Sequence, residues 1–228
     1  IFYATKNLIL ALKQTANPEI GVKNMTDQIK LEVFSDYVWP WCYLSTGRIE
    51  KLKNNYNLEV ELVHFPLHPD TPDEGLTLEE LFAGREVNIG EMYLRMKNLM
   101  NQENLEYGER SHTYNSRYAQ ELGKWADEQT KLGKKYEPIH DAFYKAYFVE
   151  GHNIGDKEVL MEITTKIGIP ENEIRKVLDE RTHSEAIDAD WAKSKAYGVT
   201  GVPTFVTNGQ GLVGAQPYEA LEQLIKSS

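Results

Sequence analysis

Apolar and polar side chains alternate in two short segments near the beginning of the chain. Residues 29–34 and 58–65 both follow this period-2 pattern, which is typical of β-strands. Between them, Pro40 suits the first position of a helix, where its missing N–H would have no partner in any case. Leu44 and Leu52 then fall on one face of that helix. The pattern predicts a strand, a helix and a second strand, which together form a βαβ unit.

A helical period replaces the alternation in residues 77–197. Thr77 and Glu80 match a capping box, in which a hydroxyl and a carboxylate three residues apart satisfy each other's backbone N–H groups. Thr182 and Glu185 match the same pattern at the start of a later helix. Apolar residues three or four apart predict the core faces of several helices. These stripes are Met92, Met96, Leu99 and Met100; Tyr118, Leu122, Trp125 and Ala126; Ile139, Phe143, Ala146 and Tyr147; and Val159, Leu160, Ile163 and Ile167.

Strand signals return after Gly198. Residues 202–206 are rich in β-formers, and the pair Asn208-Gly209 strongly favours a two-residue turn between hairpin strands. Apolar spacing predicts a last helix over residues 217–226. The expected order is therefore β-α-β, a block of helices, and then β-β-α.

The first 28 residues differ from the rest. Their apolar run, residues 8–12, is shorter than the core of a signal peptide, and no small-residue cleavage site follows it, so we expect a cytoplasmic protein. The chain does not begin with Met, and its natural start is expected either upstream or at Met25. The apolar spacing allows a short amphipathic helix ending before Pro18, with a weakly ordered tail as the alternative.

Charge and composition exclude several classes of protein. The 228 residues carry a net charge of −10, whereas a protein that follows nucleic-acid phosphates needs a basic face. No apolar run approaches the roughly 18–20 residues that cross a membrane. Cys42 is the single cysteine, which excludes an internal disulfide, a cysteine zinc site and a CxxC redox pair. We therefore expect neither nucleic acid nor membrane as a partner.

Five segments, in the same order, resemble the DsbA-like thioredoxin-fold family. The nearest branch is the FrnE-type oxidoreductases, which are related to 2-hydroxychromene-2-carboxylate isomerases and kappa-class glutathione transferases. The resemblance covers about residues 29–226 and implies an α/β protein: a thioredoxin fold with a large all-helical insertion between its βαβ and ββα halves. The segments are 36–43 (DYVWPWCY), 65–70 (FPLHPD), 148–154 (FVEGHNI), 198–205 (GVTGVPTF) and 214–216 (GAQ).

The resemblance divides the chain into four parts. We expect an N-terminal extension, a thioredoxin-like βαβ half, a helical insertion subdomain and a thioredoxin-like ββα half. Their expected bounds are residues 1–28, 29–75, 76–197 and 198–228.

The active-site segment departs from the family pattern at one position. The first cysteine of the family's dithiol falls at Trp39, and only the second remains, as Cys42. Tryptophan has no titratable group and attacks nothing, so the ordinary dithiol cycle is expected to be broken. Cys42 falls in the first helical turn, where the helix dipole lowers a thiol pKa, whereas burial raises it. The sequence does not decide which effect dominates.

Three interpretations of Cys42 stay open. It is a small buried side chain left from an ancestral redox pair, a monothiol that reacts by exchange or is held as a mixed disulfide with glutathione, or part of a site converted to another use. In the last case Trp39 and Trp41, on either side of Pro40, line an apolar pocket. Cys42 is thus the candidate catalytic residue, and the other three are candidate substrate-binding residues.

Pro203 is the second element of the candidate site. The resemblance implies a cis Val202–Pro203 bond that faces the helix start carrying Cys42. The backbone N–H and C=O of Val202 would then pair with an extended peptide or with glutathione, as an added strand does. The alternative is an ordinary trans proline at the beginning of a strand.

The resemblance implies three candidate functions. The first is a DsbA-like thiol–disulfide oxidoreductase or disulfide isomerase with at most monothiol chemistry; the second is a glutathione-dependent isomerase or transferase. The third is a non-catalytic, chaperone-like peptide-binding protein. Expected partners are a thiol- or disulfide-containing protein or peptide, or glutathione as co-substrate, and kappa-class relatives suggest a homodimer. His64 and His68 can approach the active-site face, but no metal-binding spacing occurs, so no metal is expected.

Overall fold

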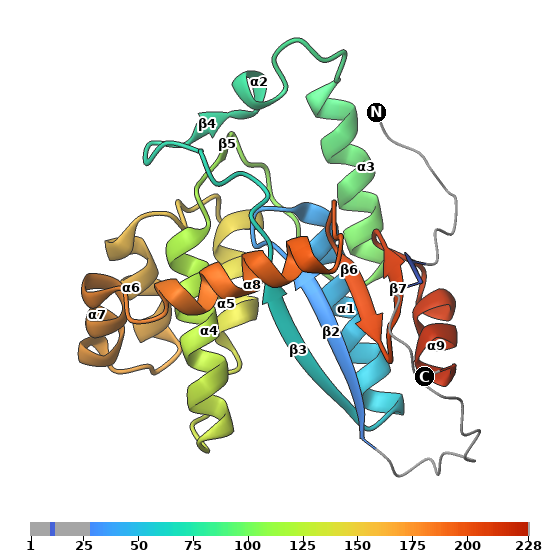
Figure 1. Cartoon of the computed structure of the whole chain (residues 1–228). Helices are drawn as coiled ribbons and strands as arrows, with labels where there is room; N and C mark the ends of the chain where they lie inside the picture. Colours follow the sequence, from blue (N-terminus) through green and yellow to red (C-terminus); the bar gives the residue numbers. More distant parts are fainter. Residues whose placement is uncertain (1–9, 12–27, 228) are drawn as a thin grey trace.

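A five-stranded sheet forms the centre of the computed structural model, which describes residues 10–11 and 28–227 (Figure 1). The strand order is β1-β7-β6-β2-β3, with β2 and β3 parallel and the other neighbours antiparallel. The order expected from the sequence, β-α-β, a block of helices and then β-β-α, is present in these residues. The strands are β1 (Leu10–Ala11), β2 (Ile29–Ser35), β3 (Leu58–His64), β6 (Thr204–Thr207) and β7 (Gln210–Val213).

Helices cover both faces of the sheet. On one face, α1 (Pro40–Asn55) and α9 (Tyr218–Lys226) pack against the apolar side chains of the strands, such as Leu31 and Val33. On the other face, α8 (Ser184–Ala196) crosses β3, and its Lys193 pairs with the carboxylate of Glu32. The alternation seen in the sequence therefore separates an apolar face of the sheet from a polar one.

The helical insertion contains the larger apolar core. Most residues of the predicted stripes are buried there, among them Met96, Leu122 and Phe143. None of the helices in the described part of the chain is long and apolar enough to cross a bilayer. Besides α8, the helices are α2 (Leu78–Leu81), α3 (Ile89–Gln102), α4 (Arg117–Lys131), α5 (Ile139–Phe148), α6 (Lys157–Lys166) and α7 (Glu171–Glu180).

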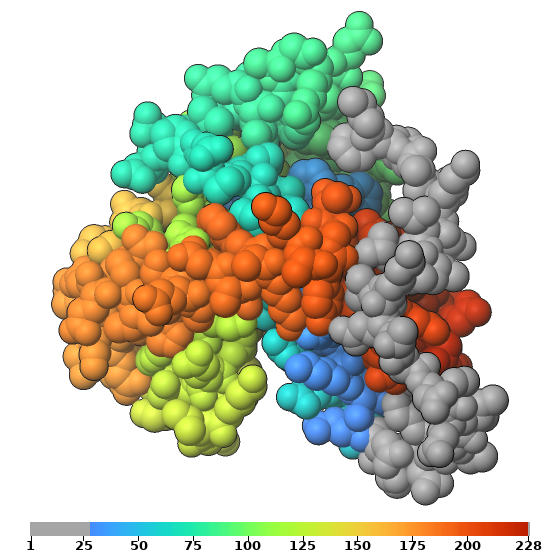
Figure 2. All heavy atoms as spheres, viewed as in Figure 1, coloured from blue at the N-terminus to red at the C-terminus, as the bar shows by residue number. Residues whose placement is uncertain are grey.

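The insertion is not all-helical, which corrects the expectation from the sequence. β4 (Leu76–Thr77) pairs antiparallel with β5 (His112–Thr113) at the base of α2. Two paired residues are too few to leave a period-2 pattern. The segment with α2 and α3 rises from the main body, and the surface is indented between the lower end of α4 and the strands β2 and β3 (Figure 2).

Two capping predictions have different outcomes. The capping box of Thr77 and Glu80 is confirmed, since both reciprocal hydrogen bonds are present. The second one is wrong: His183 occupies the N-cap of α8 and makes no side-chain cap, and the Thr182 hydroxyl is hydrogen-bonded to the His183 ring. The left-handed pair Asn208 and Gly209 confirms the predicted hairpin turn between β6 and β7.

The helix expected near the N-terminus is wrong where the structure describes it. Leu10–Ala11 pairs with β7 as a short edge strand, because backbone pairing at the sheet edge overrides a weak helical spacing. The remainder of that predicted helix lies outside the described residues.

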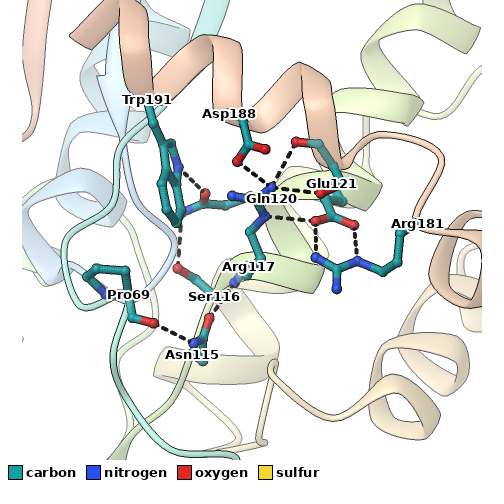
Figure 3. Close-up of polar contacts among 10 residues, drawn as sticks. Pro69, Asn115, Ser116, Arg117, Gln120, Glu121, Arg181, Asp188 and Trp191 are labelled. Atoms are coloured by element: carbon teal, nitrogen blue, oxygen red, sulfur yellow. Dashed lines mark hydrogen bonds and ion pairs between the residues drawn. The ribbon is translucent and has the colours of Figure 1, made fainter. Parts of the chain in front are cut away.

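A buried carboxylate fastens α4 to the neighbouring helices (Figure 3). Glu121, which is 0 % exposed, accepts hydrogen bonds from Arg117 on its own helix and from Arg181 at the end of α7. Arg117 also pairs with Asp188 of α8 and lies over the ring of Trp191. A buried charge requires such partners, so this cluster holds α4, α7 and α8 of the insertion together.

Candidate functional site

The candidate site lies at the beginning of α1. Trp39 is the N-cap residue and makes no side-chain cap, and Pro40 occupies the first turn, as the sequence predicted. Cys42 follows within that turn, and its N–H donates to the Trp39 carbonyl at 2.9 Å. Cys42 therefore lies in the first turn behind Trp39, and position 39, where a dithiol of the family has its first cysteine, carries an indole.

Burial decides the ionisation of Cys42. Its side chain is 2 % exposed, and loss of solvent raises its thiol pKa from 9.0 to about 12. Hydrogen bonds from the Ser35 hydroxyl and from the backbone of Asp36 favour the thiolate but do not offset the burial. Of the two effects that the sequence left open, burial dominates, and the sulfur stays protonated at neutral pH.

Trp39 and Trp41 are only partly buried, in contrast to Pro40 and Cys42 between and beside them. Both indoles pack against the large core cluster to which Cys42 belongs. They form an aromatic surface next to a buried sulfur, which suits contact with an apolar or peptide ligand better than attack on a disulfide.

The chain around Pro203 lies beside the end of β2. Phe34 pairs with Thr204 as the last register pair of β2 and β6, so Ser35 and Pro203 follow on adjacent chains at the same edge. The Val202–Pro203 peptide bond is cis. Within the described residues, the N–H and C=O of Val202 make no hydrogen bond. The edge that leads into α1 thus carries a backbone segment with unused pairing groups.

Asp36 organises the loop between β2 and α1, a role that the sequence analysis did not assign. Its carboxylate accepts from the Val38 N–H at 3.1 Å, from the Leu67 N–H at 3.1 Å and from the Gln120 side chain at 3.3 Å. Burial raises the pKa of Asp36, and these hydrogen bonds, together with one from Ser116, oppose the rise. The bond to the N–H two residues later is an Asx turn, the local signal that could have identified this role.

Two further contacts, one buried and one partly buried, join the site to α5. The Ser35 and Tyr144 hydroxyls are hydrogen-bonded at 2.9 Å, and the Tyr37 hydroxyl lies 2.6 Å from Nδ1 of His140. Nε2 of His140 lies 2.9 Å from the Asp127 carboxylate. More than 100 residues separate the partners in the first two contacts, so no local sequence signal could have identified them.

The two histidines considered in the sequence analysis have different positions. His64, at the end of β3, is 2 % exposed, and burial lowers its pKa to about 3. His68 is partly exposed, and burial together with the nearby Arg85 and Arg110 lowers its pKa. Across residues 10–11 and 28–227, no three acidic, histidine or cysteine side chains gather as a metal site would require.

The fold and site together define a thioredoxin-fold protein with a helical insertion and one buried thiol at the start of α1. The family model for the DSBA-like thioredoxin domain matches residues 30–226. The chain therefore belongs to the DsbA-like thioredoxin family, as its motifs indicated.

Individual relatives agree with this assignment. The uncharacterized protein YwbO of Bacillus subtilis (strain 168) is 25% identical over 208 residues, which is 86% of this chain and 96% of YwbO. A probable DsbA oxidoreductase, SCO1869 of Streptomyces coelicolor, is 27% identical with a TM-score of 0.78, over 87% of this chain and 89% of that structure.

A third relative is similar in fold. The cytosolic disulfide reductase DsbM from Pseudomonas aeruginosa, solved with glutathione, is 19% identical with a TM-score of 0.60, over 87% of this chain and 100% of the other.

Proposed function

We propose that this protein binds thiol- or disulfide-containing peptides, glutathione included, at the start of α1. Its covalent chemistry is at most monothiol exchange at Cys42. The observation that carries the proposal is the position of the single cysteine, buried in the first turn behind Trp39. A dithiol cycle needs a second sulfur to resolve the mixed disulfide, and this chain has none.

The ionisation of Cys42 limits its exchange rate. A thiol with a pKa of about 12 is ionised in roughly one molecule in 10⁵ at pH 7. A more basic thiolate is the better nucleophile, which recovers part of the loss, so chemistry alone leaves Cys42 about 100-fold slower than a free cysteine. Burial slows it further. In any exchange, the Cys42 thiolate forms a bond to one sulfur of a disulfide. The disulfide bond then breaks, and its other sulfur leaves as a thiolate.

Binding requires less of the site than exchange does. Trp39 and Trp41 offer aromatic surface, and Val202 offers an unused N–H and C=O for an extended peptide. The related structure of DsbM contains glutathione, which makes that tripeptide the first ligand to test. A cytoplasmic location, where glutathione is abundant and disulfides are rare, is consistent with this role.

The test compares the natural chain with Trp39→Cys in reduction of insulin disulfides by dithiothreitol. We expect the natural chain to leave the rate unchanged and Trp39→Cys, which restores a pair of sulfurs three residues apart, to accelerate it. Catalysis by a Cys42→Ser variant would contradict the proposal.

Equilibrium binding of reduced glutathione, measured on the natural chain and on a Trp39→Ala, Trp41→Ala double variant, tests the binding part. Equal affinities would contradict the role of the two indoles.

A further inference from the structure

Arg110 differs from the other arginines in its surroundings. Four arginines of the described chain are partly buried, and three of them pair with a carboxylate. No ion pair joins Arg110 to an acidic residue within residues 10–11 and 28–227, although acids outnumber bases by ten in the chain. The paired arginines are Arg48, with Glu103, and Arg117 and Arg181, both with Glu121.

Half of the Arg110 guanidinium is already bound. Its Nη1 donates to the His112 carbonyl at 3.1 Å and to the Tyr147 hydroxyl at 2.8 Å. Its Nε is buried without an acceptor, and the Tyr107 hydroxyl also interacts with the guanidinium. Nε and Nη2 form one edge of the guanidinium, and two parallel N–H donors on such an edge fit the two oxygens of a carboxylate.

Aromatic rings hold this group in place. The guanidinium carbon lies 5.1 Å from the ring centre of Tyr147 and 5.4 Å from that of Phe148. The Gly108 N–H donates to the Phe148 carbonyl at 2.9 Å, and a Cβ at position 108 would collide with the Val149 carbonyl. This close approach of the chain to the end of α5 fixes Arg110 before any ligand arrives, which reduces the entropy lost on binding.

Other polar and cationic side chains lie near Arg110. Thr113 lies beside Tyr147 and interacts with its hydroxyl. The cationic side chains of Arg85 and Arg110 both lie close enough to His68 to lower its pKa. Arg85 is exposed and extends from the loop between α2 and α3. The surroundings therefore carry positive charge and hydrogen-bond donors in an otherwise acidic protein.

This group lies within reach of the candidate site. The Phe148 ring, beside Arg110, stacks on Tyr43 at 5.4 Å with the two planes nearly parallel, and Tyr43 directly follows Cys42. A tripeptide extends over about 10 Å. One ring, that of Phe148, separates Arg110 from Tyr43, so we expect a ligand of that size to contact both Arg110 and the start of α1.

We infer that the guanidinium of Arg110 binds a carboxylate of the thiol peptide that occupies the site at the start of α1. The inference rests on the proposed function and adds the chemical group that is recognised and the residue that recognises it. Arg110 acts here by binding and takes no part in exchange at the sulfur.

The test uses S-methylglutathione, which cannot form a disulfide with Cys42, and its diethyl ester, in which both carboxylates are masked. Calorimetry on the full chain should show at least 10-fold tighter binding of the acid than of the ester. Arg110→Met should weaken binding of the acid at least 10-fold and remove the difference from the ester. Arg110→Lys keeps the charge but loses the planar guanidinium, and its affinity for the acid should lie between those of the natural chain and Arg110→Met. Arg175→Met, which removes a charge from the exposed face of α7, is the matched control and should bind as the natural chain does.

Several outcomes would overturn the inference. They are absence of binding of the acid, equal affinity for acid and ester, and unchanged affinity in Arg110→Met. Full displacement of S-methylglutathione by an equal concentration of inorganic phosphate would mean that Arg110 binds anions in general, which also overturns the inference. The pKa of His68 gives a measurement that a merely structural role of Arg110 would not change. A bound carboxylate offsets the positive charge of Arg110, so the His68 ring signals should titrate at higher pH when the acid is bound. An unchanged titration of His68 counts against the inference.

The outcomes for this inference and for the proposed function are distinguishable. Binding of S-methylglutathione that depends on Arg110, without any adduct of oxidised glutathione on Cys42, keeps the carboxylate site and removes the covalent chemistry. An adduct of oxidised glutathione that forms on Cys42 at the same rate in the natural chain and in Arg110→Met keeps the covalent chemistry and removes the carboxylate site.

Discussion

The Tyr37 hydroxyl lies 2.6 Å from Nδ1 of His140 and joins the loop before α1 to α5. Burial keeps the phenol protonated by raising its pKa well above 10.0, and Nε2 of the same imidazole donates to the Asp127 carboxylate, which can only accept. The site loop is thereby held by a chain of hydrogen bonds to residues far away in the sequence.

Gly123 makes this contact testable. A Cβ at position 123 would collide with the Tyr37 hydroxyl, so Gly123→Ala should displace the phenol and destabilise the fold by roughly 2–4 kcal/mol. Urea unfolding followed by circular dichroism measures the loss. Gly90→Ala, in α3 where a Cβ has ordinary contacts, is the control and should be neutral or stabilise the protein by up to about 1 kcal/mol. Equal stability of Gly123→Ala and the natural chain would refute the role of this contact.

The pH dependence of labelling reports the ionisation of Cys42. With a pKa of about 12, the rate of alkylation by iodoacetamide should rise about tenfold per pH unit from pH 7 to pH 10 without levelling off. A free cysteine peptide levels off near its own pKa of about 8.5 and is the reference. A plateau in the protein below pH 8 would mean that the helix start, and not burial, controls the thiol.

His64 should make the fold sensitive to acid. Its folded pKa of about 3 lies below the unfolded value, so the unfolded chain takes up a proton that the folded chain refuses between pH 6.5 and 3. Stability from this residue is therefore present above pH 6.5 and is lost as the pH falls. Between pH 7.5 and 4.5, the natural chain should lose roughly 2–3 kcal/mol more unfolding free energy than His64→Gln.

A second histidine substitution tests whether the acid sensitivity comes from the burial of His64 and not from the loss of any histidine. His152→Gln removes an exposed histidine and should keep the pH slope of the natural chain. If His64→Gln and His152→Gln show the same slope in urea unfolding, the buried neutral imidazole is not the cause of the acid sensitivity.

The carboxylate of Glu121 should be costly to remove. Glu121→Ala leaves the guanidinium groups of Arg117 and Arg181 without their shared partner and should destabilise the fold by about 3–5 kcal/mol. Glu171→Ala breaks an exposed pair with Arg175 and should cost at most about 0.5 kcal/mol. Thermal unfolding of both variants gives the comparison, and losses of similar size would contradict the structural role of the buried cluster.

The sequence predicts those elements whose information is local. The alternation in residues 29–34, the proline at the first turn of α1, the capping box at Thr77 and the turn at Asn208-Gly209 each depend on neighbours in the chain, and all are present. The β4–β5 pair, by contrast, consists of two residues on each side, too few for any period to show.

Contacts of the candidate site depend on long-range packing and are less accessible to sequence analysis. The motif places Cys42 in the first helical turn, but the size of its pKa shift follows from how completely the core encloses it. The bond from Tyr37 to His140 forms only after the insertion packs against the loop before α1, and the surroundings of Arg110 join parts of the insertion that lie 37 residues apart. No spacing along the chain encodes these relationships.

Four stacked rings run from the helix of Cys42 toward the raised segment with α2 and α3. Tyr43 lies on Phe148, Phe148 on Tyr107 at 5.8 Å, and Tyr107 on Tyr93 of α3 at 5.8 Å. A hinge-like swing of α3 would have to slide one ring off the next, at a cost of about 0.5–1.5 kcal/mol for each separated pair. Ring stacking thus joins the raised segment to the helix of Cys42, and we expect a ligand to meet a surface that is formed in advance instead of being enclosed by a moving flap.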